Sequence, residues 1–185
     1  MEIVKVITRA GGGQSYVKNA LEYCIDDRRL MTKGYGIDKD DPAMAAMQLR
    51  KTAEFWNNRG KNSLIQYMIS FSSDTAPTAE KAMQLTEEIL SPVVGEHQAL
   101  TVAHKDENDV PSYHTHTVAG TTNYNDGAMM YSDNRTNYAI AQRAADVTGE
   151  PVTLVVSYEQ GSDWVCPKHF LPEEESGKEI CKEQK

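Results

Sequence analysis

At 185 residues, the chain is long enough to bury the core of one domain without disulfide bonds. Its hydrophobic fraction of 39% and charged fraction of 25% are ordinary for a globular protein, and every apolar run is shorter than the ~20 residues that span a bilayer. A formal net charge of −8 disfavours unspecific attraction to nucleic acid, yet residues 1–61 hold eleven of the nineteen lysines and arginines against eight acids.

The first half of the chain has patterns for two strands and two helices. We expect a strand at residues 3–7, a helix at 15–25, a helix at 42–58 and a strand at 64–71. Both strands are rich in β-branched or aromatic residues. Ser15 follows a glycine-rich turn and is a candidate N-cap. Asp41 followed by Pro42 is a second helix start, because proline fits the first helical position.

The second half adds three strands and two helices. We expect a helix that starts at Thr75 or Thr78 and runs to about Leu90, because residues at helical spacing form one apolar face. The other elements are strands at 98–104 and 113–119, a helix at 134–147 and a strand at 152–157. The link between the strands at 98–104 and 113–119 is too short for a parallel crossover, so they are expected to be antiparallel.

The order of elements, β-α-α-β-α-β-β-α-β, indicates an α+β fold. Its central sheet is expected to be mostly antiparallel, with about five strands and flanking helices. We expect one domain over residues 1–170, followed by a charged tail over residues 171–185. The N-terminus has no apolar segment of a signal peptide, and an odd number of cysteines is ordinary where disulfides are rare. These features predict a cytoplasmic protein without membrane insertion.

A cluster of three histidines is the feature most closely tied to chemistry. Strand side chains alternate, so His114 and His116 are expected on one face, and antiparallel pairing would bring His104 beside them. Three protein ligands with an open position make up a catalytic metal site. Asp106 can orient one of these histidines through an outer hydrogen bond. The alternative to a metal site is that the histidines are ordinary polar residues on a solvated strand face. The alternative for Asp106 is an exposed position in a loop.

Tyr23 is a candidate functional residue because packing does not require it. Val17, Ala20, Leu21 and Cys24 form the apolar stripe of the first helix, and Tyr23 lies off that stripe. A tyrosine hydroxyl can act as a covalent nucleophile when it is activated.

Four segments give the chain its resemblance to a known family. They are Ala20-Leu21-Glu22-Tyr23, residues 67–72, residues 96–106 and residues 114–118. In this order they resemble the nuclease domain of the relaxase/mobilisation family, which belongs to the HUH endonuclease superfamily. The resemblance runs from Ile3 to about Val147. It implies an HUH-relaxase-like sheet with flanking helices.

The resemblance also implies a role for the histidine cluster. His104, His114 and His116 would be the ligands of one divalent metal ion. Mn²⁺ or Mg²⁺ is expected first, with Zn²⁺ and Ni²⁺ as alternatives, because imidazole does not select sharply among them. His97 belongs to the same motif region as a supporting residue and is not an expected ligand.

The implied activity is site-specific and strand-specific nicking and rejoining of DNA. Tyr23 would form a 5′-phosphotyrosyl link to single-stranded DNA at an origin of transfer, during mobilisation or conjugation of a plasmid or mobile element. Accessory DNA-binding proteins and secretion-coupling proteins are the further expected partners. Among exposed aromatic and basic residues, Tyr16, Arg28 and Arg29 are candidates for contacts to bases and phosphates, although ordinary surface is the alternative.

Two other classes of function remain open from the sequence. The chain could be a metal-dependent hydrolase of small phosphoesters, which needs neither Tyr23 nor a DNA groove. It could instead be a DNA-binding module that has lost activity, a hypothesis that the net negative charge favours. A covalent adduct between protein and oligonucleotide separates these classes, because only the relaxase mechanism forms one.

Overall fold

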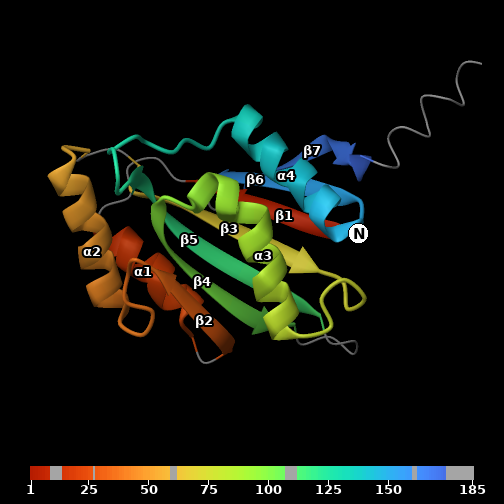
Figure 1. The fold of residues 1–185 in the computed structure, drawn as a ribbon, viewed down its shortest axis with the longest axis horizontal. Coiled ribbons are helices and arrows are strands. Elements are labelled where there is room, and N and C mark those ends of the chain that lie inside the picture. The colour runs from red at the N-terminus through yellow and green to blue at the C-terminus, as the bar shows by residue number, and fades with distance from the viewer. Residues whose placement is uncertain (9–13, 27, 59–61, 107–111, 160–161, 174–185) are drawn as a thin grey trace, which may run out of the picture.

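The computed structural model describes residues 1–8, 14–26, 28–58, 62–106, 112–159 and 162–173. Within these ranges, seven strands form one mixed sheet in the order β2-β4-β5-β3-β1-β6-β7 (Figure 1). The strands are β1 (Glu2–Ile7), β2 (Arg29–Tyr35), β3 (Leu64–Phe71), β4 (His97–Lys105), β5 (Tyr113–Asn123), β6 (Val152–Glu159) and β7 (Ser162–Phe170). β1 and β6 are parallel, and the other neighbouring pairs of this sheet are antiparallel.

Helices pack on both faces of the sheet. In the described ranges they are α1 (Gln14–Cys24), α2 (Pro42–Phe55), α3 (Ala79–Val94) and α4 (Asn134–Thr148). α3 lies against β2, β4 and β5, α4 lies against β1, β6 and β7, and α1 and α2 contact each other and β5. α1 and α2 cover one face of the sheet, and α3 covers the opposite face. Neighbouring residues of β4 show this, because Val102 packs beneath α1 and α2 whereas Ala103 packs against α3.

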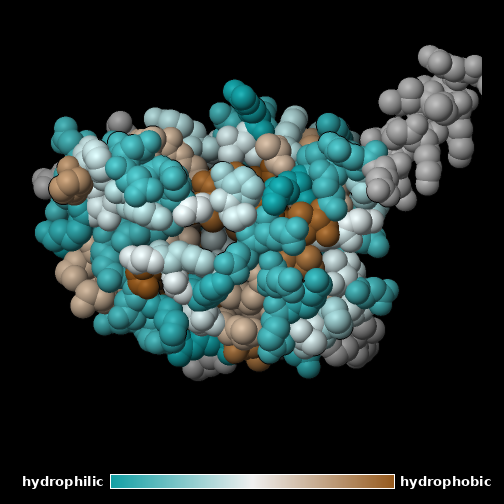
Figure 2. Space-filling model, viewed as in Figure 1, coloured by the Kyte–Doolittle hydropathy of each residue, from teal (hydrophilic) through white to brown (hydrophobic). Residues whose placement is uncertain are grey.

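Each face of the sheet has its own apolar core. The larger core lies under α3 and α4 and includes Ile69, Ile89, Ile140 and Leu154. The smaller core lies under α1 and α2, where Leu21 of α1 is fully buried. On the side of the molecule seen in Figure 2, hydrophilic residues predominate and apolar ones form small separate patches. The smaller core holds α1 on the sheet, and α1 carries Tyr23.

Two predicted helix starts are confirmed, but the predicted cap Ser15 is wrong, because α1 already begins at Gln14. The Asp41 side chain accepts hydrogen bonds from two backbone N–H groups in the first turn of α2. Of the two candidate starts for α3, Thr78 is the N-cap. Gly149 ends α4 with a φ of 71°, a left-handed conformation that glycine adopts without steric cost. None of the helices in the described residues is both long and apolar enough to cross a bilayer.

The expected α+β class and mostly antiparallel sheet are confirmed, but the expected number of about five strands is wrong. The two missed strands, β2 and β7, are the two edges of the sheet. β7 is largely solvent-exposed and contains Pro167, and β2 consists of exposed and half-buried residues. Edge strands need no alternating apolar pattern, and charges or proline are common there. Most of the predicted tail, residues 171–185, lies outside the described residues.

Candidate active site

The strand register brings the three histidines together. β4 and β5 are antiparallel neighbours in which His104 lies opposite His114, and Val102 lies opposite His116. All three side chains therefore point to the face that carries α1. Their ring centroids are 5.0–5.3 Å apart, and one ligand nitrogen from each lies within 4.8 Å of the others. This spacing allows a single metal ion to contact all three imidazoles.

One ring nitrogen of His104 is hydrogen-bonded within the protein, and the other is available as a metal ligand. Its Nε2–H donates to the backbone carbonyl oxygen of Cys24 at 3.0 Å. Its Nδ1 is buried and has no hydrogen-bond partner among the described residues. A neutral imidazole with a proton on Nε2 carries its lone pair on Nδ1. Because a buried acceptor without a partner is costly, this atom fits a bound metal ion.

His114 has a similar arrangement through a carboxylate. Its Nδ1–H donates to Asp106 Oδ1 at 2.7 Å, and Asp106 Oδ2 accepts from Ser112 Oγ at 2.8 Å. The bond fixes the tautomer and leaves Nε2 with the lone pair. A carboxylate in this position also holds a ligand histidine in a fixed orientation.

His116 meets an amide rather than a carboxylate. Its Nδ1 lies 3.4 Å from the side-chain amide of Gln66, which is also 3.7 Å from Cys24 Sγ. Coordination through Nε2 requires a proton on Nδ1, so the amide oxygen of Gln66 must then face the ring. The two orientations of a glutamine amide have nearly the same shape, and the bound tautomer selects between them.

Burial keeps two of the histidines neutral. The pKa of His116 is lowered to about 3, first by burial and then by the neighbouring His114 and His104. Burial also lowers the pKa of His104. A histidine must be neutral to bind a metal ion, and both rings are in this state near neutral pH.

This depressed pKa predicts a loss of stability in acid. An unfolded histidine has a pKa of about 6.5, so below that value the unfolded state binds a proton that folded His116 rejects. The free energy of unfolding of the metal-free protein should fall by on the order of 1–2 kcal/mol between pH 6.5 and pH 5. Urea unfolding in a chelating buffer measures this, and His116→Gln should reduce the slope. An unfolding free energy that stays constant over this range would contradict the prediction.

Tyr23 lies beside the histidine cluster. It is the second-last residue of α1, and its ring centroid is 5.7 Å from that of His116 in an edge-to-face contact. The next residue, Cys24, is buried, whereas Tyr23 is 55% exposed. α1 therefore buries its apolar stripe and presents Tyr23 to solvent next to a candidate ligand.

The remaining predicted site residues are in different surroundings. Arg28 and Arg29 are exposed, and Arg29 lies opposite His104 in the register of β2 and β4. Tyr16 is half-buried and packs against the smaller core. His97 is at the other end of β4, where its Nδ1 lies 2.9 Å from the carbonyl oxygen of Gly120. The structure therefore does not bring His97 into the histidine cluster.

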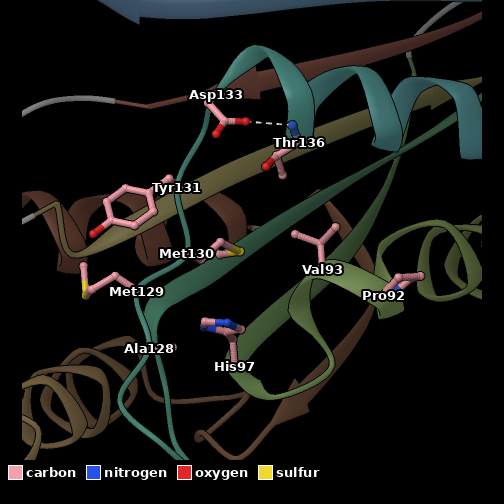
Figure 3. A pocket seen from close by; sticks show the side chains of 9 residues that line it. All are labelled: Pro92, Val93, His97, Ala128, Met129, Met130, Tyr131, Asp133 and Thr136. Atoms are coloured by element: carbon pink, nitrogen blue, oxygen red, sulfur yellow. Dashed lines mark hydrogen bonds between the residues drawn. The ribbon is translucent and has the colours of Figure 1, made fainter.

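His97 instead lines a separate pocket (Figure 3). This pocket has a volume of about 360 Å³ and is lined by the end of α3, the segment 128–131 and the start of α4. In Figure 3 the ring of His97 lies below Met130, and Asp133 caps α4 through the backbone N–H of Thr136. None of the three clustered histidines lines this pocket.

Three residues that contact the histidines were not predicted from the sequence. They are Cys24, Gln66 and Asp26, whose Oδ1 is 3.6 Å from His104 Nε2. The sequence contained an indication for Gln66, because it is a polar residue in the otherwise apolar start of β3, where the structure buries it. Cys24 acts through its backbone carbonyl, which no residue type could indicate.

A comparison with protein families gives one match over most of the chain. The model of the relaxase family described as MobA/VirD2-like, nuclease domain, matches residues 16–150. This range includes Tyr23 and the three clustered histidines. No curated protein matches the chain.

Proposed function

The chain belongs to the relaxase family, within the group of MobA/VirD2-like nuclease domains, and on this basis we propose that it nicks and rejoins one DNA strand through Tyr23. The observation that carries the proposal is the position of an exposed tyrosine beside three histidines, one of which has a buried ligand nitrogen with no hydrogen-bond partner in the described part of the chain. A hydrolase of small phosphoesters would not need an exposed tyrosine at this position.

His104, His114 and His116 are the proposed ligands, with Mn²⁺ or Mg²⁺ as the first choice and Zn²⁺ or Ni²⁺ as alternatives. When bound, such an ion polarises the scissile phosphate and stabilises the charge that develops on it. The protein contributes the orientation of the rings. Asp106 fixes His114, the Cys24 carbonyl fixes His104, and Gln66 adjoins His116.

The proposed reaction is a transesterification at phosphorus. The hydroxyl oxygen of Tyr23 forms a bond to phosphorus as the bond from phosphorus to the 3′-oxygen breaks. The phenol loses its proton, and the departing 3′-oxygen gains one. The products are a 5′-phosphotyrosyl strand and a free 3′-hydroxyl. No water is consumed, so the phosphodiester energy is kept and the reverse attack rejoins the strand.

Single-stranded DNA at an origin of transfer is the proposed substrate. His104 and His116 are only 1% and 4% exposed, so a phosphate must approach closely to reach the cluster. In duplex DNA, stacked and paired neighbours restrict the approach of the phosphate to side chains that are buried in this way. Mobilisation of a plasmid or mobile element, with accessory DNA-binding and secretion-coupling proteins, is the setting that we propose for this activity.

We expect a single-stranded oligonucleotide to bind better than the same sequence as duplex. The net charge is −8, so affinity should depend on few phosphate contacts. The salt dependence should be shallow, on the order of that expected when two to four phosphates are neutralised and their counterions are released. Fluorescence anisotropy across a salt series, with and without Mn²⁺, measures both quantities. Equal affinity for the two forms would count against this substrate.

The test of the proposed function is the covalent adduct itself. Wild-type protein, Mn²⁺ and single-stranded oligonucleotides from an origin of transfer should give a product that survives denaturing electrophoresis. Mass spectrometry of the digested adduct should locate the nucleotide on Tyr23. Hydrolysis of a small phosphodiester without any adduct would favour the hydrolase, and DNA binding without either reaction would favour an inactive DNA-binding module.

A further inference from the structure

The turn after α1 joins the neighbourhood of Tyr23 to a candidate metal ligand. Asp26 is the central residue of this connection. Its Oδ2 accepts from Arg28 Nε at 2.8 Å, and its Oδ1 accepts from the backbone N–H of Arg28 at 2.9 Å. The same Oδ1 lies 3.6 Å from His104 Nε2. One carboxylate therefore contacts an arginine on one side and a histidine of the cluster on the other.

Arg28 extends the connection to the proposed nucleophile. Its guanidinium carbon is 5.9 Å from the centre of the Tyr23 ring. The pKa of Arg28 is raised first by the hydrogen bond to Asp26 and next by a hydrogen bond to Tyr23. The hydrogen bond from Arg28 in turn lowers the pKa of Asp26. Tyr23, Arg28, Asp26 and His104 thus form one continuous chain of contacts.

We infer that Asp26 is a positioning residue for the proposed nicking reaction, acting through both of its neighbours. It holds the Arg28 guanidinium beside Tyr23, where Arg28 binds a non-bridging oxygen of the scissile phosphate. Its negative charge, 3.6 Å from the Nε2 that donates to the Cys24 carbonyl, also favours the His104 tautomer with the proton on Nε2, which leaves Nδ1 for the metal ion. This inference rests on the proposed function, and it assigns to Arg28 a contact with the reacting phosphate rather than with DNA in general.

The geometry favours arginine for this role. A guanidinium presents its donors in a fixed planar fork, so Asp26 can occupy one edge while other N–H groups remain for a phosphate. Arg28 is exposed, which leaves it accessible to a DNA strand at Tyr23. Without Asp26 the long side chain would sample many rotamers, and the phosphate would have to select one of them. Asp26 is therefore expected to affect the reaction step more than the binding of DNA.

A double-mutant cycle tests whether Asp26 acts through Arg28. Asp26→Asn keeps an oxygen for the Arg28 backbone N–H and removes the charge. We expect it to lower the single-turnover nicking rate by about fivefold, and Arg28→Ala by about twentyfold, because contacts that are partly exposed are screened. At a saturating concentration of Mn²⁺, which removes the effect on metal affinity, the double variant should be no slower than Arg28→Ala alone. The dissociation constant for DNA should change by less than about threefold, which separates positioning from simple attraction.

Metal affinity gives a second readout that does not depend on activity. Titration of the metal-free protein with Mn²⁺ should show weaker binding for Asp26→Asn, by about threefold, because a negative charge close to His104 is lost. Arg28→Ala should bind Mn²⁺ at least as tightly as the wild type, since a nearby positive charge is removed. A general loss of structure would weaken binding in both variants.

Matched controls come from an ion pair on the other face of the sheet. Lys33 pairs with Glu87 of α3, and both side chains are about half exposed. Glu87→Gln and Lys33→Ala make the same changes in charge and should leave nicking and Mn²⁺ binding unchanged. Either of two results overturns the inference and leaves the proposed function standing. In the first, the wild type forms the adduct and Asp26→Asn matches its nicking rate. In the second, the wild type forms the adduct and the effects of Asp26→Asn and Arg28→Ala on that rate are additive. If the wild type forms no adduct, the proposed function fails and the inference fails with it.

Discussion

Tyr23→Phe should abolish the covalent adduct and lower the rate of DNA nicking by on the order of a thousandfold or more. The substitution keeps the ring and its edge-to-face contact with His116, and it removes only the hydroxyl oxygen that would bond to phosphorus. Because Tyr23 is 55% exposed, the free energy of unfolding should change little. Denaturing electrophoresis with a labelled oligonucleotide measures the adduct, and urea unfolding measures the stability.

Tyr131→Phe is the matched control for this variant. Tyr131 is 63% exposed and lines the pocket that contains His97, so the same chemical change occurs away from the histidine cluster. It should leave adduct formation at the wild-type level. An adduct of undiminished yield in Tyr23→Phe would move the nucleophile to another tyrosine, and Tyr16 on the same helix would be tested next.

The histidine cluster shows what local patterns can predict. The alternation of His114 and His116 fixes their common face in any strand, and the short link after His104 requires β4 and β5 to be antiparallel. Those two rules are enough to bring the three rings together, as the structure has them. The position of Tyr23 off the apolar stripe was likewise readable from helical spacing.

The surroundings of the cluster depend on contacts that local patterns do not contain. His104 donates to a carbonyl 80 positions earlier in the chain, and His116 meets Gln66 from a strand 50 positions away. These contacts exist only after the smaller core has packed α1 onto the sheet. A backbone carbonyl has no residue type, so the acceptor for His104 could not be found from composition or spacing. The edge strands β2 and β7 were missed because their exposed residues carry no alternating pattern.

The cluster also explains how an acidic protein can act on DNA. The net charge of −8 gives no general attraction to a polyanion, but two neutral, buried imidazoles take no charge away from a bound cation. With the proposed metal site, positive charge would be concentrated at the ion and at the exposed Arg28 and Arg29, which follow Tyr23 closely in sequence. We expect binding to be weak without metal and to recover with it, whereas a basic DNA-binding protein would bind in both conditions.

Removal of a single imidazole should remove most of the metal affinity. We expect His114→Ala to weaken Mn²⁺ binding by at least about a hundredfold, because even outer-shell partners of a metal site contribute ~10–100-fold. His114 is the most accessible of the three, with its side chain 16% exposed, so its loss should disturb the core least. Calorimetric titration of the metal-free protein with Mn²⁺ measures the affinity directly. His169→Ala removes an exposed histidine of β7 and should bind Mn²⁺ like the wild type.

Thermal unfolding gives an independent measure of the same site. A ligand that binds only the folded state at a hundred times its dissociation constant stabilises it by about 2.7 kcal/mol. The wild type and His169→Ala should therefore unfold at a higher temperature with Mn²⁺ than with a chelator, and His114→Ala should show no such difference. If His114→Ala instead binds Mn²⁺ as tightly as the wild type and is stabilised equally, the ion is held elsewhere. The free Nδ1 of His104 would then need another explanation.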